Sequence, residues 1–176
     1  MTTPEPDVTS KKTPPFNQEH PLKKDFREAM ARLGAAVNLV TTDGPAGRAG
    51  FAATAVCSVS DSPPMMIVCL NRASSAYEAV KTNGVVCINI LAETHQELSK
   101  LFGGKTPIEE RFSAGQWYSI VSGAPALHGA IASLDCEITN IYDGSSHDIL
   151  VCEVIDIRNG ILQPALVYLN RAYHSL

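Results

Sequence analysis

A run of small and hydroxyl-bearing residues in a strand-like segment is the feature that most constrains this chain. It lies within GFAATAVCSVSDSPPMMIVCLNRASS, which spans residues 50–75. Bulky β-branched and aromatic residues are the norm in a strand, but residues 52–55 are Ala-Ala-Thr-Ala, and Ser58 and Ser60 add hydroxyl groups at a spacing of two. The backbone N–H and C=O groups of such a segment are open to a ligand. The run therefore predicts a slot for a flat, polar molecule that approaches the main chain.

A polar cluster after the next strand suits an anion. Pro63 and Pro64 break the chain, and residues 65–70 have the pattern of a buried strand. The strand ends in amide, guanidinium and hydroxyl groups, supplied by Asn71, Arg72, Ser74 and Ser75. We expect a short helix to begin at Ser74, and the positive end of a helix favours an anion. The two strands should thus place an anion-binding corner beside the slot.

The rest of the pattern predicts a mainly β fold with flanking helices. We expect helices over 21–33, 74–82 and 94–102, and strands over 36–42, 48–60, 65–70, 85–91, 134–141, 148–157 and 166–173. Residues 143–147 should form the loop of a hairpin. Many strands at short spacing favour a closed or nearly closed antiparallel barrel. Residues 1–19, rich in proline, are interpreted as a flexible arm, and residues 20–176 as one domain.

Composition limits the classes of function. The chain has 176 residues, of which 45% are hydrophobic and 18% charged, as is typical of a globular domain. A net charge of −4 argues against nucleic acid or an anionic membrane as the main partner. The longest wholly apolar run, 65–70, is far shorter than the roughly 18 residues that span a bilayer.

The five cysteines all lie in apolar, strand-like runs. They are Cys57, Cys69, Cys87, Cys136 and Cys152, and no two of them have the CxxC spacing. An odd number of cysteines in strands argues against a disulfide framework or a metal site. They are interpreted as buried, reduced thiols of a cytoplasmic protein.

Three short motifs resemble catalytic signatures but lack the context those signatures need. A GGKT sequence at 103–106 is like the end of a phosphate-binding P-loop, but Ser99 stands where the first glycine belongs, and a helix precedes it. No GxGxxG occurs, so any nicotinamide cofactor would bind without a Rossmann domain. Ser146, His147 and Asp148 match a catalytic triad in composition only, because three neighbours in sequence cannot hydrogen-bond in the required order.

Several segments together resemble the flavin reductase-like family. They are the small-residue run with SVSDSPP and NRASS, and also AVNLVTTDGPAGRAGF, LFGGKTPIEERF, HDILVCEV and the terminal NRAYHSL. The resemblance covers roughly Phe26 to Leu176, and its motifs are specific as a set. Two positions depart from the pattern. Ala52 stands where many relatives have threonine, and Ser145-Ser146 precedes His147 where Gly-Asp is common.

The resemblance implies a split, Greek-key-like antiparallel β-barrel that binds FMN, with FAD as a second option. It implies an NAD(P)H-dependent flavin reductase, in which hydride passes from C4 of NADH or NADPH to N5 of the flavin. The reduced flavin is then supplied to a separate monooxygenase. A homodimer is expected, closed by the helix around Phe26 and by the loop after Phe102. The cofactors carry the reactivity, so we expect side chains to position them and none to act as a chemical catalyst.

The candidate site residues follow from the slot, the corner and the resemblance. The candidates for flavin binding are Ala53, Thr54, Ala55, Cys57, Ser58, Asn71, Arg72, Ser74, Ser75, Phe102, Gly103 and Lys105. The resemblance places His147, Arg171 and Tyr173 at the nicotinamide nucleotide. The residues alone favour a different interpretation, with Ser58 on a solvent-facing edge, His147 in an exposed loop and Tyr173 in a strand that closes the barrel.

Two other functions are compatible with the same residues. One is a non-catalytic FMN-binding protein built on the same barrel. The other is a pyridoxine phosphate oxidase-like enzyme, which shares the architecture but generally carries more basic residues than Arg48, Arg72 and Lys105 provide.

Overall fold

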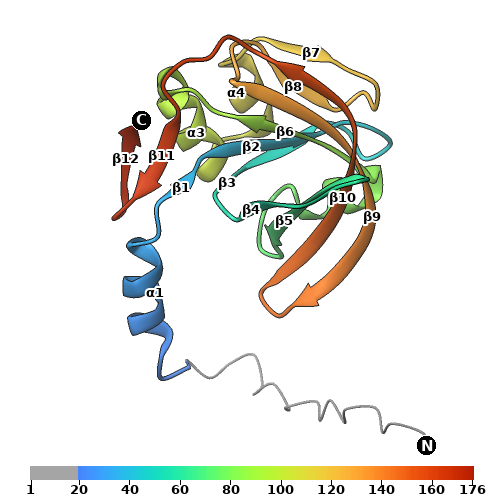
Figure 1. The fold of residues 1–176 in the computed structure, drawn as a ribbon. Helices are drawn as coiled ribbons and strands as arrows, with labels where there is room; N and C mark the ends of the chain where they lie inside the picture. The colour runs from blue at the N-terminus through green and yellow to red at the C-terminus, as the bar shows by residue number, and fades with distance from the viewer. Residues whose placement is uncertain (1–19) are drawn as a thin grey trace, which may run out of the picture.

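The main sheet of the protein has seven antiparallel strands (Figure 1). The structure is a computed structural model that describes residues 20–176, so the arm expected over residues 1–19 lies outside the described residues. In spatial order the strands are β3 (Ala49–Ala53), β2 (Asn38–Thr42), β6 (Val85–Ile90), β9 (Ala132–Gly144), β10 (His147–Asn159), β5 (Pro64–Asn71) and β4 (Val56–Asp61). The expected mainly β fold is confirmed.

The two edge strands of this sheet are consecutive in the chain. Only Thr54 and Ala55 separate β3 from β4, although five strands lie between them in the sheet. Such a link spans at most about 11 Å, so the sheet curls until its edges meet at one corner. Within residues 20–176, β3 and β4 are not paired with each other. The expected single strand over 48–60 is wrong, because the chain leaves one edge and enters the other at Thr54.

Two small sheets and short helices complete the described part of the chain. The sheets are β1 (Ala35–Ala36) with β11 (Leu166–Leu169) and β12 (Ala172–Ser175), and β7 (Trp117–Ser119) with β8 (Pro125–Leu127). The helices are α1 (Lys23–Ala31), α2 (Tyr77–Asn83), the 3-10 helix η1 (Glu93–His95), α3 (Gln96–Gly103) and α4 (Ile108–Ser113). None of these helices is long and apolar enough to cross a membrane. The expected last strand is instead a hairpin, since Asn170 and Arg171 have φ of 50° and 60° and turn the chain.

The long β9–β10 hairpin joins the two halves of the main sheet. β9 pairs with β6, and β10 pairs with β5 in a register that places His147 opposite Asn71. The predicted hairpin is confirmed, but its strands are longer than expected. Its turn is only Ser145-Ser146, with Ser145 at φ 72°. Because β10 begins at His147, that side chain is held at a defined position in the sheet.

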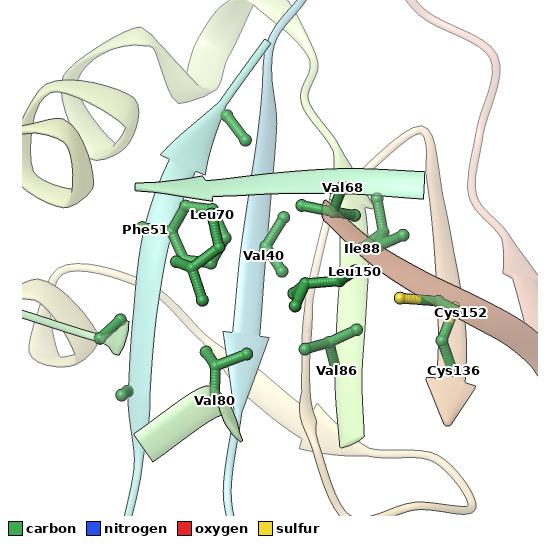
Figure 2. Close-up of a cluster of buried hydrophobic side chains, with 13 residues drawn as sticks. Val40, Phe51, Val68, Leu70, Val80, Val86, Ile88, Cys136, Leu150 and Cys152 are labelled. Atoms are coloured by element: carbon green, nitrogen blue, oxygen red, sulfur yellow. The ribbon is translucent and has the colours of Figure 1, made fainter. Parts of the chain in front are cut away.

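A hydrophobic core fills the concave side of the curled sheet and packs against α2 (Figure 2). Val40, Leu70, Val80 and Leu150 have no exposed surface, and Phe51 is 7% exposed. Burying a side chain of this size contributes about 1.5–3 kcal/mol. The core therefore holds β2, β3, β5 and β10 in fixed relation, and with them the corner where the sheet edges meet.

A second, aromatic cluster lies under α3 and α4. The rings of Phe102, Phe112 and Trp117 pack with centroids 4.9–5.7 Å apart. Glycine is required beside it, because a Cβ at Gly50 would lie 2.8 Å from Cε1 of Phe102. This close approach sets the end of α3 against β3.

The cysteines are free, but they are not all buried. Cys87, Cys136 and Cys152 are buried, Cys69 is partly buried and Cys57 is exposed. Burial raises the pKa of Cys152 to about 12, so this thiol stays protonated at neutral pH. The expectation of burial is wrong for Cys57 because β4 is an edge strand with a solvent-facing side.

Candidate functional site

A cavity of about 400 Å³ opens where the two edges of the main sheet meet. This volume falls within the about 300–1,000 Å³ typical of small-molecule sites. Its walls come from the end of β3 and the link to β4, from the end of β5 and the following turn, and from the end of α3. The lining residues are Phe51, Ala52, Ala53, Thr54, Ala55, Cys69, Asn71, Ala73, Ser74, Ser75, Phe102, Gly103, Gly104, Arg111 and His147.

The small-residue run forms one wall of this cavity, as the sequence predicted. Thr54 and Ala55 are exposed and lie between the two edge strands. The carbonyl of Ala55 accepts a hydrogen bond from the N–H of Cys69 at 3.0 Å, which fixes the link against β5. Methyl side chains at 52, 53 and 55 leave the main chain of this wall within reach of a ligand.

A polar turn forms the opposite wall. The N–H of Ala73 donates to Oδ1 of Asn71 at 2.8 Å, and the N–H of Ala76 donates to Oγ of Ser74 at 3.2 Å. Side chains that bond to nearby backbone in this way stabilise turns in place of helix. The expected helix start at Ser74 is therefore wrong, since α2 begins at Tyr77 and its end does not lie at the serines.

A buried cation, Arg111 of α4, stands behind this wall. It is 4% exposed and, among residues 20–176, is the only arginine or lysine that lines the cavity. Its Nε donates to the carbonyl of Thr106 at 2.7 Å, and its Nη1 to that of Gly50 at 3.1 Å. Its Nη2 donates to Oγ of Ser75 at 3.2 Å and to the carbonyl of Gly104 at 3.3 Å. All four acceptors are neutral.

In the part of the chain that the structure describes, no carboxylate balances the charge of Arg111. Within residues 20–176, no ion pair involves this guanidinium. Burying a charge without an opposite charge is costly, and an anion in the cavity would offset that cost through charge-assisted hydrogen bonds. Arg111 and Ser75 therefore form the part of the cavity that is chemically suited to an anion.

The sequence did not predict Arg111 as a site residue, because residues 106–116 were not expected to form a helix. The signal was present, since Ile108 and Phe112 are apolar at a spacing of four and Pro107 precedes them, as at a helix start. Arg111 is next to Phe112 on that helix, and both side chains are buried.

Arg72, the cation that the sequence favoured, does not line the cavity. Its Nε and Nη2 lie 2.7 and 2.6 Å from Oδ1 of Asp148, and Nη2 lies 3.0 Å from Asp143. Asp148 is buried and also accepts bonds from the hydroxyl of Tyr77 at 2.6 Å and from Nζ of Lys81 at 3.3 Å. The Tyr77 hydroxyl, together with Arg72 and Lys81, lowers the pKa of Asp148 to about 2. Arg72 thus ties the turn to β9 and β10, while Tyr77 and Lys81 tie α2 to the same carboxylate.

The three nicotinamide candidates are not brought together. His147 lines the cavity opposite Asn71, with Nδ1 3.0 Å from Oγ of Ser146. Arg171 lines a separate hollow of about 850 Å³ between α1 and the β11–β12 hairpin, which meets the cavity at Thr54. The hydroxyl of Tyr173 lies 3.1 Å from Oγ of Ser99, and its ring packs against the hydrophobic cluster that includes Phe102 and Phe112.

Other candidates also lie outside the cavity. Cys57 and Ser58 are exposed on β4, which runs away from the corner, and Lys105 lines a neighbouring hollow. The predicted flavin-binding residues that do line the cavity are Ala53, Thr54, Ala55, Asn71, Ser74, Ser75, Phe102 and Gly103. No group of three or more His, Cys, Asp or Glu side chains in residues 20–176 is placed to hold a metal ion.

The cavity therefore has a backbone wall, an aromatic side and a cationic end. Phe51 and Phe102 supply apolar surface, the link at 54–55 supplies main-chain groups, and Arg111 with the polar turn supplies the cationic end. A planar heterocycle that carries a phosphate matches all three features. A phosphate matches the last of them best, because guanidinium and hydroxyl donors bind its oxygens strongly.

Known proteins are similar to this chain in both sequence and fold. Residues 30–176 match the family described as flavin reductase like domain. A protein of Agrobacterium fabrum described as FMN reductase (NADH) RutF is 62% identical over 152 residues, which cover 86% of this chain and 87% of that protein.

Two solved structures are similar along most of the chain. One, from Haemophilus somnus and described as a candidate flavin reductase, has a TM-score of 0.85 and 45% identity, and the match covers 88% of this chain and 99% of that one. Another, nitrilotriacetate monooxygenase component B from Mycobacterium thermoresistibile, has a TM-score of 0.81 and 25% identity, with 87% and 86% covered. This chain therefore belongs to the flavin reductase-like domain family.

Proposed function

We propose that this protein is an NADH-dependent FMN reductase. The observation that carries the proposal is the cavity at the corner of the curled sheet, with the main chain of 54–55 on one side and the buried, unbalanced cation Arg111 at one end. The Agrobacterium relative is described as an FMN reductase that uses NADH. Family membership and site geometry support the same activity.

The residues of the cavity fit FMN. In the proposal, the ring system lies along the backbone wall of Ala53, Thr54 and Ala55, and the phosphate lies at Ser75 and Arg111. When bound, the flavin supplies the hydride acceptor, and the chemistry belongs to the cofactor. The protein's contribution is to hold two cofactors in reacting geometry, which alone supplies a large part of a rate enhancement.

The nicotinamide nucleotide is placed at the open side of the cavity. His147 lines the cavity, and the pairing of β10 with β5 fixes its position opposite Asn71. Arg171 lies across Thr54 in the adjoining hollow and would meet the far end of the dinucleotide. Tyr173 is assigned a supporting role through Ser99 of α3.

The proposal extends to the assembly and its setting. The curled sheet is the split β-barrel, forming one domain over residues 20–176, and exposed apolar side chains on α1 support a homodimer. Reduced flavin passes to a separate monooxygenase, as the description of the Mycobacterium thermoresistibile protein suggests for that protein. Five free cysteines suit the reducing cytoplasm.

The test is nicotinamide oxidation that depends on added flavin. Purified, folded protein is mixed with NADH, with or without FMN, and the absorbance of reduced nicotinamide is followed. We expect NADH consumption only when FMN is present, and a parallel assay with NADPH gives the preference. FMN binding without NADH consumption would refute the reductase and favour a non-catalytic flavin protein. Oxidation of pyridoxine phosphate by the FMN-loaded protein would favour the oxidase-like alternative.

A further inference from the structure

A single arginine, Arg72, contacts both sides of the tight turn between β9 and β10. Its Nη2 lies 3.0 Å from Oδ1 of Asp143 at the end of β9 and 2.6 Å from Oδ1 of Asp148 near the start of β10. Its backbone N–H donates to the carbonyl of Ser146, inside the turn, at 3.1 Å. Residue 72 therefore contacts the hairpin before, within and after the turn.

The turn needs this support for two reasons. Asp143 and Asp148 are directly opposite each other on β9 and β10, and like charges at facing positions repel. Ser145 has φ 72°, a conformation that costs free energy in a residue with a side chain. The guanidinium of Arg72 offsets the repulsion. The N–H of Ser145 donates to Oδ1 of Asp143 at 2.7 Å, which ties the strained residue to the same carboxylate.

His147 transmits the conformation of this turn to the cavity. It is the first residue of β10 and lies at the end of both strand pairings, opposite Gly144 on β9 and Asn71 on β5. Its Nδ1 lies 3.0 Å from Oγ of Ser146 in the turn, and the residue lines the cavity. A change in the turn would therefore move the imidazole while the core of the sheet stays in place.

We propose that Arg72 is a positioning residue for the nicotinamide nucleotide and that it acts through the turn and His147. The inference rests on the proposed function, because it needs the nucleotide at His147. Arg72 is not among the residues that line the cavity, so it acts on the nucleotide from outside. The guanidinium orients the turn, and the turn orients the imidazole. The backbone wall at 53–55 and Arg111 have other contacts, so flavin binding does not depend on Arg72.

The test compares Arg72→Lys with the matched control Tyr77→Phe. Lysine keeps a positive charge beside the buried carboxylate of Asp148, but one ammonium group cannot replace the planar fork that contacts Asp143 and Asp148 together. Tyr77→Phe removes a bond of 2.6 Å to the other oxygen of Asp148 and leaves the contacts of Arg72 with the turn intact. The two variants thus disturb one carboxylate from its two sides.

We expect Arg72→Lys to raise the KM for NADH about tenfold, because a small displacement of a binding group is costly. The Kd for FMN, measured by fluorescence without NADH, should stay within about twofold. In flavin-free protein, the NMR resonances of the His147 ring, assigned by their loss in His147→Ala, should shift in Arg72→Lys. Tyr77→Phe should change none of the three measurements.

The double variant shows whether Arg72 acts through the histidine. If it does, adding Arg72→Lys to His147→Ala should leave the KM for NADH as it is in His147→Ala alone, since the group to be positioned is already gone. A role in stability alone would leave the two effects additive.

Four results would overturn the inference. They are an unchanged KM for NADH in Arg72→Lys, unshifted resonances of the His147 ring, an equal rise in KM in Tyr77→Phe, and additive effects in the double variant. Each is measured with a parent protein that oxidises NADH, so each leaves the proposed function standing. A parent protein that oxidises no NADH in the presence of FMN would overturn the proposed function and this inference with it.

Discussion

Ser75 is the residue through which the buried guanidinium of Arg111 reaches the polar turn. Ser75→Ala removes this hydroxyl, which is worth about 1.5–3 kcal/mol when it bonds to a charged group. We expect the Kd for FMN to rise about tenfold or more, while the Kd for riboflavin, which lacks the phosphate, stays within about twofold. Flavin fluorescence titration measures both constants.

Ser113→Ala is the matched control for this prediction. Ser113 lies on the same helix as Arg111, but its hydroxyl donates to the carbonyl of Glu110 at 3.0 Å and it does not line the cavity. The control should bind both flavins as the parent does. If Ser75→Ala weakens FMN and riboflavin equally, the phosphate does not lie at this hydroxyl.

Asp148 makes stability depend on pH in the acidic range. Its pKa is lowered from 3.8 to about 2 in the folded protein, first by the hydroxyl of Tyr77 and then by Arg72 and Lys81. The unfolded chain therefore binds this proton at higher pH than the folded protein does. The stabilisation is complete above about pH 4 and is lost as the pH falls towards 2. The free energy of unfolding in denaturant should fall across this window, and less steeply in Asp148→Asn.

The same network predicts what Arg72 does. Arg72→Ala should measurably lower the free energy of unfolding at neutral pH, since it removes bonds to a buried carboxylate. The ratio of the Kd values for FMN and riboflavin should not change. A selective loss of FMN affinity would return Arg72 to the phosphate site.

The role of a residue in the cavity was predictable from the sequence where that role depends on the neighbouring residues in the chain. Small residues at 52–55 leave the main chain accessible in any strand, and they do line the cavity. The roles of Arg72 and Arg111 were not predictable, because each depends on partners distant in sequence. Asp148 lies 76 positions from Arg72, and Gly50 lies 61 positions from Arg111.

At the scale of secondary-structure elements, the sequence predicted where most strands lie. It did not predict where two of the expected strands are interrupted. The β9–β10 hairpin follows from alternation in the sequence, and β6 occupies 85–90 of the expected 85–91. Apart from small side chains, nothing in the local sequence marks the break at Thr54. The break arises because the whole sheet curls and places the two parts of 48–60 on opposite edges. The turn at Asn170-Arg171 was missed because it lacks the glycine that usually marks such a turn.

The packing of β3 against α3 can be tested by replacing one of two glycines, Gly50 or Gly103, with alanine. In Gly50→Ala the new Cβ would lie 2.8 Å from Cε1 of Phe102 and 3.1 Å from the carbonyl of Val40. We expect the free energy of unfolding to fall by about 1–3 kcal/mol, as for other overpacked sites. In the control Gly103→Ala, the nearest atom is Cβ of Ala52 at 3.8 Å, an ordinary contact. Denaturant unfolding of both variants checks this, and equal stabilities would show that β3 and α3 move apart freely.

At the scale of the whole molecule, α1 is the element that most needs a partner. It stands away from the main sheet (Figure 1), has no buried residue and contacts the β11–β12 hairpin through an ion pair of Glu28 with Arg171 at 2.7 Å. Its apolar side chains Leu22, Phe26 and Met30, and Leu33 just after it, are 44–64% exposed. A helix of nine residues is marginal in water without tertiary contacts. These features support the proposed homodimer, with α1 packed on a second copy of the chain.

The dimer is tested with Phe26→Glu, which places a charge in the apolar face of α1. We expect the parent to sediment as a dimer and Phe26→Glu as a monomer at the same concentration, since burying an unpaired charge at an interface is costly. Asp25→Asn changes charge on the same helix without touching that face, and should remain dimeric. A monomeric parent protein would contradict the prediction.

The strand order also sets the time at which the cavity is completed during synthesis. Both facing walls, at the ends of β3 and β5, are made before residue 76, but in the sheet they are joined through β9 and β10. The two strands that join these walls are therefore translated well after them, over 132–159. A ribosome-bound chain that ends after β5 already contains the main-chain groups of both walls. It lacks the pairing with β9 and β10 that sets the distance between these walls. Flavin capture thus belongs to the finished chain and follows the emergence of the β9–β10 hairpin.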